Sequence, residues 1–195
     1  AGTLLASSAA ALGTGAVNLA GGTLLGGSTF SFANVLTFAS GQTSVLAAAT
    51  GTTLTQAGLL QVLGNAVATF GSTTDLGTVV LAPTGGSLNP NGSVVVAGGT
   101  LQSGSSTTSF FYQFLRSTTV NSGATLDLND WTTTIKNLQG AGTVRTGSIA
   151  SLTTTVQGGD FAGTITGAGR LAVSGGTLTL TGDNTYAGGT NVGAG

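Results

Sequence analysis

A serine-nucleophile mechanism has no candidate residues in this sequence. The 195 residues include no His, and a Ser-His-Asp triad needs His as the base that activates the serine. Neither a Gly-x-Ser-x-Gly nor a Gly-Asp-Ser-Gly motif occurs, although serine hydrolases often hold the nucleophile in such a turn. We therefore expect no acyl-transfer chemistry from this chain.

Carboxylates are the next side chains whose spacing suggests catalysis. Asp127 and Asp130 stand three residues apart beside Trp131, and Asp160 and Asp183 could stack near them on later turns of a repeat. Paired carboxylates about 5 to 9.5 Å apart can hydrolyse glycosidic bonds, so a carbohydrate-active enzyme is an alternative hypothesis. We favour the interpretation that these Asp residues cap chain corners, as Asp and Asn side chains often do. Our prediction is that the protein is not an enzyme.

No metal, cofactor or nucleic-acid site is predicted. The Gly-Gly-x-Gly-x-Asp nonapeptide that binds Ca²⁺ in some β-helices is missing from the sequence. The chain has four basic residues and a net charge of −1. Nucleic-acid backbones are bound by clustered Lys and Arg, so we exclude that class of partner.

The densest aromatic cluster is the segment Phe110-Phe-Tyr-Gln-Phe-Leu-Arg116. Exposed aromatic rings can anchor interfaces. The candidate recognition surface therefore consists of Phe110, Phe111, Tyr112 and Phe114. In the competing interpretation, these rings stack on one another or cover the side of the fold. We expect a loop or short helix inserted at residues 109–117.

Composition favours an all-β fold. Charged residues make up 5% of the chain, the mean hydropathy is +0.41, and Gly accounts for 35 residues. Such a chain should collapse, because disorder normally requires low hydropathy and high net charge. Thr and Val favour strands and Gly and Asn favour turns, which indicates many short strands joined by tight corners.

Internal repetition indicates how these strands are arranged. Gly-Gly-Thr-Leu occurs three times at even spacing, at 21–24, 98–101 and 175–178. Related Gly-Thr-apolar or Gly-Ala-Thr-Leu units lie at 123–126, 142–144 and 163–165. From Leu101 onward the apolar members step by about 18 to 25 residues, a period typical of solenoids. This unit suits one turn of a parallel β-helix, whose stacked turns bury a continuous core.

Charge divides the chain into two parts. Asp75 is the only charged residue before Arg116. We expect nearly uncharged β-helix turns over 1–115 and further turns over 116–195. Trp131 and Tyr186 fall inside the repeat pattern, so we expect them at core or corner positions.

The C-terminal stretch resembles a known family repeat. Residues 160–195, DFAGTITGAGRLAVSGGTLTLTGDNTYAGGTNVGAG, are similar to the passenger-associated strand repeat of bacterial autotransporters. Residues 123–144, GATLDLNDWTTTIKNLQGAGTV, look like the unit that commonly precedes that repeat. The corner motif TGDNTYAGGT includes Asp183 and Asn184, which supports the capping interpretation of the carboxylates. Asn129 is expected to act at a corner in the same way.

The resemblance implies a right-handed parallel β-helix exported by type V secretion. We expect the chain to be a mature piece or fragment, namely the passenger region alone. The C-terminal β-barrel that attaches such passengers to the outer membrane would lie outside it. The implied location is extracellular, on the bacterial cell surface, with membrane contact only through that missing barrel.

The expected function is that of an adhesin or rigid spacer that promotes attachment or self-aggregation. Residues 177–181, Thr-Leu-Thr-Leu-Thr, alternate polar and apolar side chains, so one face should present a ladder of hydroxyls. Expected partners are a host surface or matrix component, a glycan, or an identical passenger on a neighbouring cell. The chain could instead be a pure stalk for a functional domain elsewhere. Ice-binding proteins also use such ladders, but the family resemblance points to adhesion.

Overall fold

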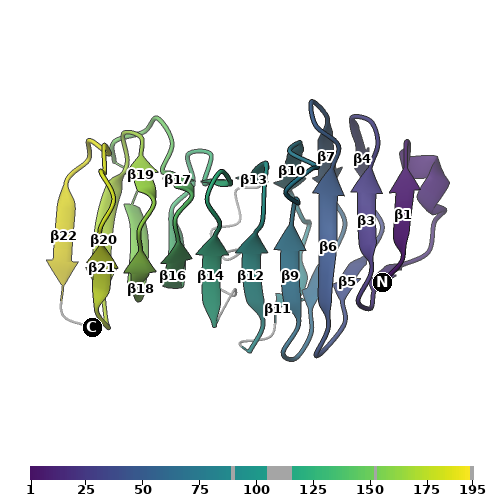
Figure 1. The fold of residues 1–195 in the computed structure, drawn as a ribbon, viewed down its shortest axis with the longest axis horizontal. Coiled ribbons are helices and arrows are strands. Elements are labelled where there is room, and N and C mark those ends of the chain that lie inside the picture. Colours follow the sequence, from purple (N-terminus) through teal and green to yellow (C-terminus); the bar gives the residue numbers. More distant parts are fainter. Residues whose placement is uncertain (89–90, 105–115, 152, 194–195) are drawn as a thin grey trace.

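The protein folds as a parallel β-helix of about eight turns. The computed structural model describes residues 1–88, 91–104, 116–151 and 153–193. The strands stack side by side along one axis, and the two termini lie at opposite ends of the stack (Figure 1). The predicted all-β parallel β-helix is therefore confirmed.

Three sheets form the walls. An eleven-stranded sheet contains β1 (Thr3–Ala6), β3 (Thr23–Gly26), β6 (Thr43–Ala48), β9 (Val67–Phe70), β12 (Ser93–Val96), β14 (Ser117–Val120), β16 (Thr133–Gly140), β18 (Thr153–Phe161), β20 (Arg170–Ser174), β21 (Leu178–Leu180) and β22 (Thr190–Gly193). A seven-stranded sheet contains β4 (Phe30–Phe32), β7 (Thr53–Gln56), β10 (Thr78–Leu81), β13 (Thr100–Ser103), β15 (Thr125–Asp127), β17 (Thr143–Arg145) and β19 (Thr164–Thr166). A four-stranded sheet contains β2 (Val17–Leu19), β5 (Leu36–Phe38), β8 (Leu60–Val62) and β11 (Gly86–Leu88).

The length of a turn varies along the stack. Thr3 pairs with Thr23, twenty residues later, whereas Val67 pairs with Ser93, 26 residues later. The corners between strands differ in length and account for this variation. Many of them contain Gly, which adopts positive φ without steric cost. Gly41, for example, has a φ of 70° in the corner two residues before β6.

Two long strands turn a corner without leaving the sheet. β16 bends at Asn137, whose φ is 44°, and β18 bends at Gly158 and Gly159, whose φ values are 82° and 130°. The first part of β18 pairs with β20, and its last three residues pair with β21. In the first turns, a strand of the four-stranded sheet precedes each of β3, β6, β9 and β12 of the eleven-stranded sheet. In the last turns, the same position is occupied by the first halves of β16 and β18 and by β20 and β22.

The repeat period predicted from Leu101 onward is confirmed. Leu101 pairs with Leu126, Leu126 with Val144, and Val144 with Ile165, in consecutive turns of the seven-stranded sheet. All four side chains point inward and are at most 1% exposed. Burying each such side chain contributes roughly 1.5 to 3 kcal/mol, so the column is a major part of the core.

The three Gly-Gly-Thr-Leu copies do not mark one structural period. Leu24 and Leu178 lie in β3 and β21 of the eleven-stranded sheet, whereas Leu101 lies in β13 of the seven-stranded sheet. The motif is a corner followed by a strand, and any wall of the helix can use that combination. The even spacing of the three copies therefore does not correspond to a structural repeat.

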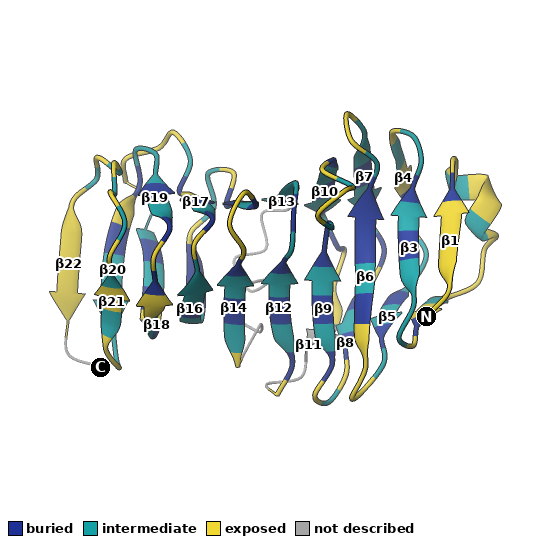
Figure 2. Cartoon of the chain, viewed as in Figure 1, coloured by how far each residue is buried: buried dark blue, intermediate teal, exposed yellow. Residues whose placement is uncertain are grey.

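Exposure rises at the two ends of the stack. β6, the third strand from the N-terminal end of the sheet, is mostly buried, whereas the end strands β1 and β22 are exposed along most of their length (Figure 2). The short 3₁₀ helix η1 (Ala9–Leu12) contacts β4, the first strand of the seven-stranded sheet. A covered edge is protected from pairing with other chains.

The expected division near residue 115 remains a prediction. Both long sheets cross this position, because β12 pairs with β14 and β13 pairs with β15. Within the described ranges, no helix is long and apolar enough to span a membrane.

Candidate functional site

The outer face of the seven-stranded sheet carries an unbroken threonine column. We use this name for six residues that pair one above another in successive turns: Thr53, Thr78, Thr100, Thr125, Thr143 and Thr164. Their neighbours along each strand point into the core, so the threonines face outward. All six are half-buried. Adjacent strands lie about 4.8 Å apart, which makes the column a regular row of hydroxyl and methyl groups.

The hydroxyls of the threonine column are not used to hold the fold. Among the residues that the structure describes, none of the six Oγ1 atoms makes a hydrogen bond. A β-branched side chain is restricted at χ1, so each group is held rigidly without needing such a bond. The column can therefore both donate and accept hydrogen bonds toward a partner.

The hydroxyl ladder predicted around residues 177–181 lies elsewhere. Thr179 does point outward, and Leu178 and Leu180 pack against the core, as the alternation predicts. However, Thr179 pairs with Asp160, and Asp160 pairs with Gln139. That column is therefore mixed, and the continuous hydroxyl row is on the seven-stranded sheet.

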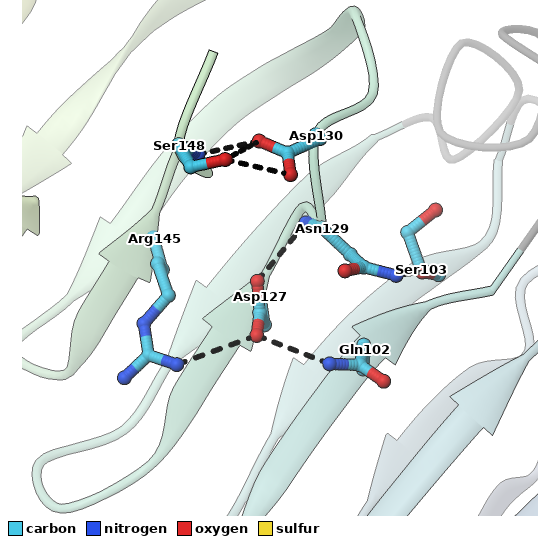
Figure 3. Close-up of polar contacts among 7 residues, drawn as sticks. All are labelled: Gln102, Ser103, Asp127, Asn129, Asp130, Arg145 and Ser148. Carbon is cyan, nitrogen blue, oxygen red and sulfur yellow. Dashed lines mark hydrogen bonds and ion pairs between the residues drawn. The ribbon is translucent and has the colours of Figure 1, made fainter. Parts of the chain in front are cut away.

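A polar cluster lies beside the threonine column, two residues along the strands. Asp127 Oδ2 accepts a hydrogen bond from Gln102 Nε2 at 3.2 Å and lies 3.5 Å from Arg145 Nη1 (Figure 3). The Asp127 side chain is only 8% exposed, whereas that of Arg145 is 58% exposed. Its other oxygen, Oδ1, accepts from the Asn129 backbone N–H at 2.9 Å. Asp127 thus links three successive turns and starts the following corner.

Asn129 and Asp130 form that corner with left-handed backbone, at φ values of 49° and 62°. Asn129 Nδ2 donates to the Ser103 carbonyl at 2.9 Å, which ties the corner to the preceding turn (Figure 3). The Asp130 carboxylate accepts hydrogen bonds from the backbone N–H and hydroxyl of Ser148 and from the Ile149 N–H. The Ser148 backbone hydrogen bond, above all, lowers the pKa of Asp130 below its ordinary value of 3.8.

The four candidate carboxylates do not gather at one place. Asp160 lies in β18 and pairs with residues of the eleven-stranded sheet, whereas Asp127 lies in the seven-stranded sheet. The expectation that Asp160 would stack near Asp127 is therefore wrong, because the intervening turns carry the two residues onto different walls. Asp183 is exposed after β21.

Asn184 acts as a corner cap. Its Oδ1 accepts from the Ile165 N–H at 2.8 Å, and its Nδ2 donates to the Gly182 carbonyl at 3.0 Å. The first bond satisfies an amide on the free side of β19, the last strand of the seven-stranded sheet. The side chain thus replaces the next strand at this position.

The remaining predicted residues differ in what the structure describes. Phe110, Phe111, Tyr112 and Phe114 lie outside the described residues, so the aromatic recognition surface stays a prediction. Tyr186 is half-buried against the core, with its hydroxyl 2.5 Å from Thr190 Oγ1. Trp131 is also half-buried, and within the described part of the chain its indole nitrogen is buried without a hydrogen-bond partner.

The described surface grooves lie away from Asp127 and Asp130. Two surface grooves of about 490 and 410 Å³ are lined by residues before Gln42, and neither includes Asp127 or Asp130. In the described ranges, no three acidic side chains are close enough to hold a metal ion. Comparison with family models, curated proteins and solved structures finds no match to this chain.

Proposed function

We propose that this chain is the rod of a surface-displayed autotransporter passenger that acts as an adhesin. The observation that carries the proposal is the threonine column, an outward row of unused hydroxyls on a rigid β-helix. The C-terminal resemblance to the passenger-associated strand repeat adds the export route and the location on the cell surface. A second role as a spacer is compatible with the same rod.

The threonine column suits contact with an identical chain. Each hydroxyl can donate and accept a hydrogen bond, so a row of hydroxyls is complementary to a second copy of itself. The face is narrow, and a contact made by strands of three or four residues is small beside the roughly 800 Å² that each partner buries in a standard interface. A single contact would be weak, but many rods on two cells would bind through avidity. A glycan or a host matrix component is the other partner class.

A non-enzymatic role is supported by the hydrogen bonds of the carboxylates. Asp127 accepts a bond from the Asn129 backbone amide in its own corner, and Asp130 accepts one from the Ile149 backbone amide in the corner of the next turn. A general acid or nucleophile needs access to a substrate, and these two side chains are occupied in joining turns. Release of reducing sugar from a glycan, abolished by Asp130→Ala, would instead support the carbohydrate-active alternative.

Bead clumping tests the adhesive role. Beads coated with the 195-residue chain should aggregate, and Thr100→Lys combined with Thr125→Lys should reduce aggregation by placing like charges on the column. The matched control is Thr69→Lys with Thr119→Lys, because both residues are half-buried outward positions of the eleven-stranded sheet. Equal loss in both double variants would argue against the threonine column. Absence of clumping, and of binding to glycan and matrix-protein arrays, would leave the spacer role.

A further inference from the structure

The corner between β11 and β12 contains the only Asn-Gly dipeptide of the chain, Asn91-Gly92. Asn91 is exposed, and Gly92 is buried directly before the first residue of β12. Glycine has no Cβ, so its backbone nitrogen is the least shielded of any residue that can follow an asparagine. The Asn91 side-chain amide and the Gly92 backbone nitrogen, which can react with each other, therefore lie directly before β12.

We propose that Asn91 is a site of spontaneous backbone modification. The Gly92 nitrogen loses its proton and attacks the Asn91 side-chain amide carbon, a new C–N bond forms, and ammonia leaves. Water then opens the resulting five-membered succinimide at one of its two carbonyls. The products are Asp, or an isoaspartyl residue in which the main chain runs through the side-chain carbon. The reaction needs only water and gives up one ammonia, and it converts a neutral side chain into a carboxylate.

The location gives this modification a structural effect. The Gly92 carbonyl accepts a hydrogen bond from the Arg116 N–H at 3.1 Å, and the Ser93 N–H donates to the Ala66 carbonyl at 3.0 Å. These two bonds tie the corner to the turn after it and the turn before it. An isoaspartyl residue lengthens the main chain by one carbon immediately before both bonds. It thereby shifts the register at which β12 enters the eleven-stranded sheet.

The new charge also arises opposite a basic residue. Ser93 pairs with Ser117, which places Gly92 level with Arg116 in the next turn. Arg116 is exposed and is one of four basic residues in the chain. Modification therefore places a carboxylate at residue 91, one residue before the position level with Arg116. Before Arg116 the chain has only one charged residue, Asp75.

The previous turn provides an internal control. Val67 pairs with Ser93, so Asn65-Ala66 occupies the same corner position one turn earlier. Asn65 is exposed like Asn91, and Ala66 is buried like Gly92. The residue that follows the asparagine is Ala66 at the earlier site and Gly92 at the later one, and the methyl group of Ala66 hinders the attacking nitrogen.

Peptide mass spectrometry of the folded 195-residue chain, incubated at neutral to mildly alkaline pH, tests the proposal. Asn91 should convert to Asp and isoaspartate several-fold faster than Asn65, and isoaspartyl methyltransferase should label the product. Gly92→Ala should slow the conversion to the rate at Asn65, and Asn91→Gln should abolish the labelling. Conversion should be accompanied by faster proteolytic cleavage at this corner. Equal rates at the two sites, or an unchanged Asn91 after prolonged incubation, would overturn the proposal. It does not depend on the adhesive role, since clumping is not measured.

Discussion

The Asp130 carboxylate accepts hydrogen bonds from the backbone amide and the hydroxyl of Ser148, which lies eighteen residues later and one turn further along the stack. The Ile149 N–H donates to the same carboxylate at 3.1 Å. A single side chain thus supplies the acceptors for a corner that has no neighbouring strand to pair with. Contacts between neighbouring turns, such as this one, contribute a large part of the stability of a solenoid.

Removing this cap should weaken the stack locally. We expect Asp130→Ala to lower the midpoint of urea unfolding, because the Ser148 and Ile149 amides lose their acceptor. Asp183→Ala is the control, since Asp183 is exposed and, within the described residues, its side chain makes no hydrogen bond. Equal midpoints for the two variants would show that solvent replaces the carboxylate without cost.

The contribution of Asp130 should also depend on pH. Its pKa in the folded protein lies below 3.8, so the charged form stabilises the fold above that pH and the benefit is lost as the pH falls toward the lower, folded-state value. The difference in unfolding midpoint between the native chain and Asp130→Asn should therefore be largest near neutrality and should shrink as the pH falls below 3.8. A difference that stays constant from neutral to acid pH would contradict this assignment.

A glycine beside the cap should be sensitive to substitution. Gly147 has a φ of 93°, and a Cβ at this position would overlap Asp130 Oδ1. Gly123 has a φ of 80°, but a Cβ there would meet open space. Gly123→Ala should cost roughly 1 to 2 kcal/mol through backbone strain alone. Gly147→Ala should cost about 1 to 3 kcal/mol more, as measured by denaturant unfolding, and equal costs would argue against the clash.

The inner and outer faces of the seven-stranded sheet should respond differently to truncation. Leu126 is fully buried between Leu101 and Val144, so Leu126→Ala should cost about 2 to 5 kcal/mol. Thr125→Ala removes an outward group without a hydrogen-bond partner among the described residues, and should change the free energy of unfolding by about 0.5 kcal/mol or less. A large loss for Thr125→Ala would show that the threonine column stabilises the fold. The column would then be less available as a contact surface.

The Arg145–Asp127 ion pair should contribute little by itself. Arg145 is 58% exposed and approaches Asp127 through one nitrogen at 3.5 Å, and such pairs are worth about 0 to 1 kcal/mol. Arg145→Gln should therefore leave the unfolding midpoint nearly unchanged. Asp127→Ala should lower it more, because the Asn129 N–H and the Gln102 amide also lose their acceptor.

Much of the fold follows from local sequence patterns. The spacing of Leu101, Leu126, Val144 and Ile165 predicts the stacking of four successive turns, because each unit combines a Gly corner with an inward apolar residue. The capping role of Asn184 also follows from its corner motif. The even spacing of Gly-Gly-Thr-Leu does not predict a structural period, because the same corner motif can precede a strand of any of the three sheets.

The candidate site depends on which wall each residue reaches. Thr53 and Thr78 belong to one outward column, whereas Asp127 and Asp160 belong to different sheets. Neither result can be read from spacing alone, because a turn takes from 17 to 26 residues. Small differences in corner length therefore decide the position of every later side chain.

The sequence by itself determined the β class, the period of the later turns and the lack of a histidine-assisted nucleophile. These depend on residue type and on neighbours within one turn. Only the tertiary structure decided that six threonines form one column and that Asp130 caps a corner eighteen residues away. Both depend on register between turns, which is fixed when the inward columns pack together and each strand pairs with the one before it.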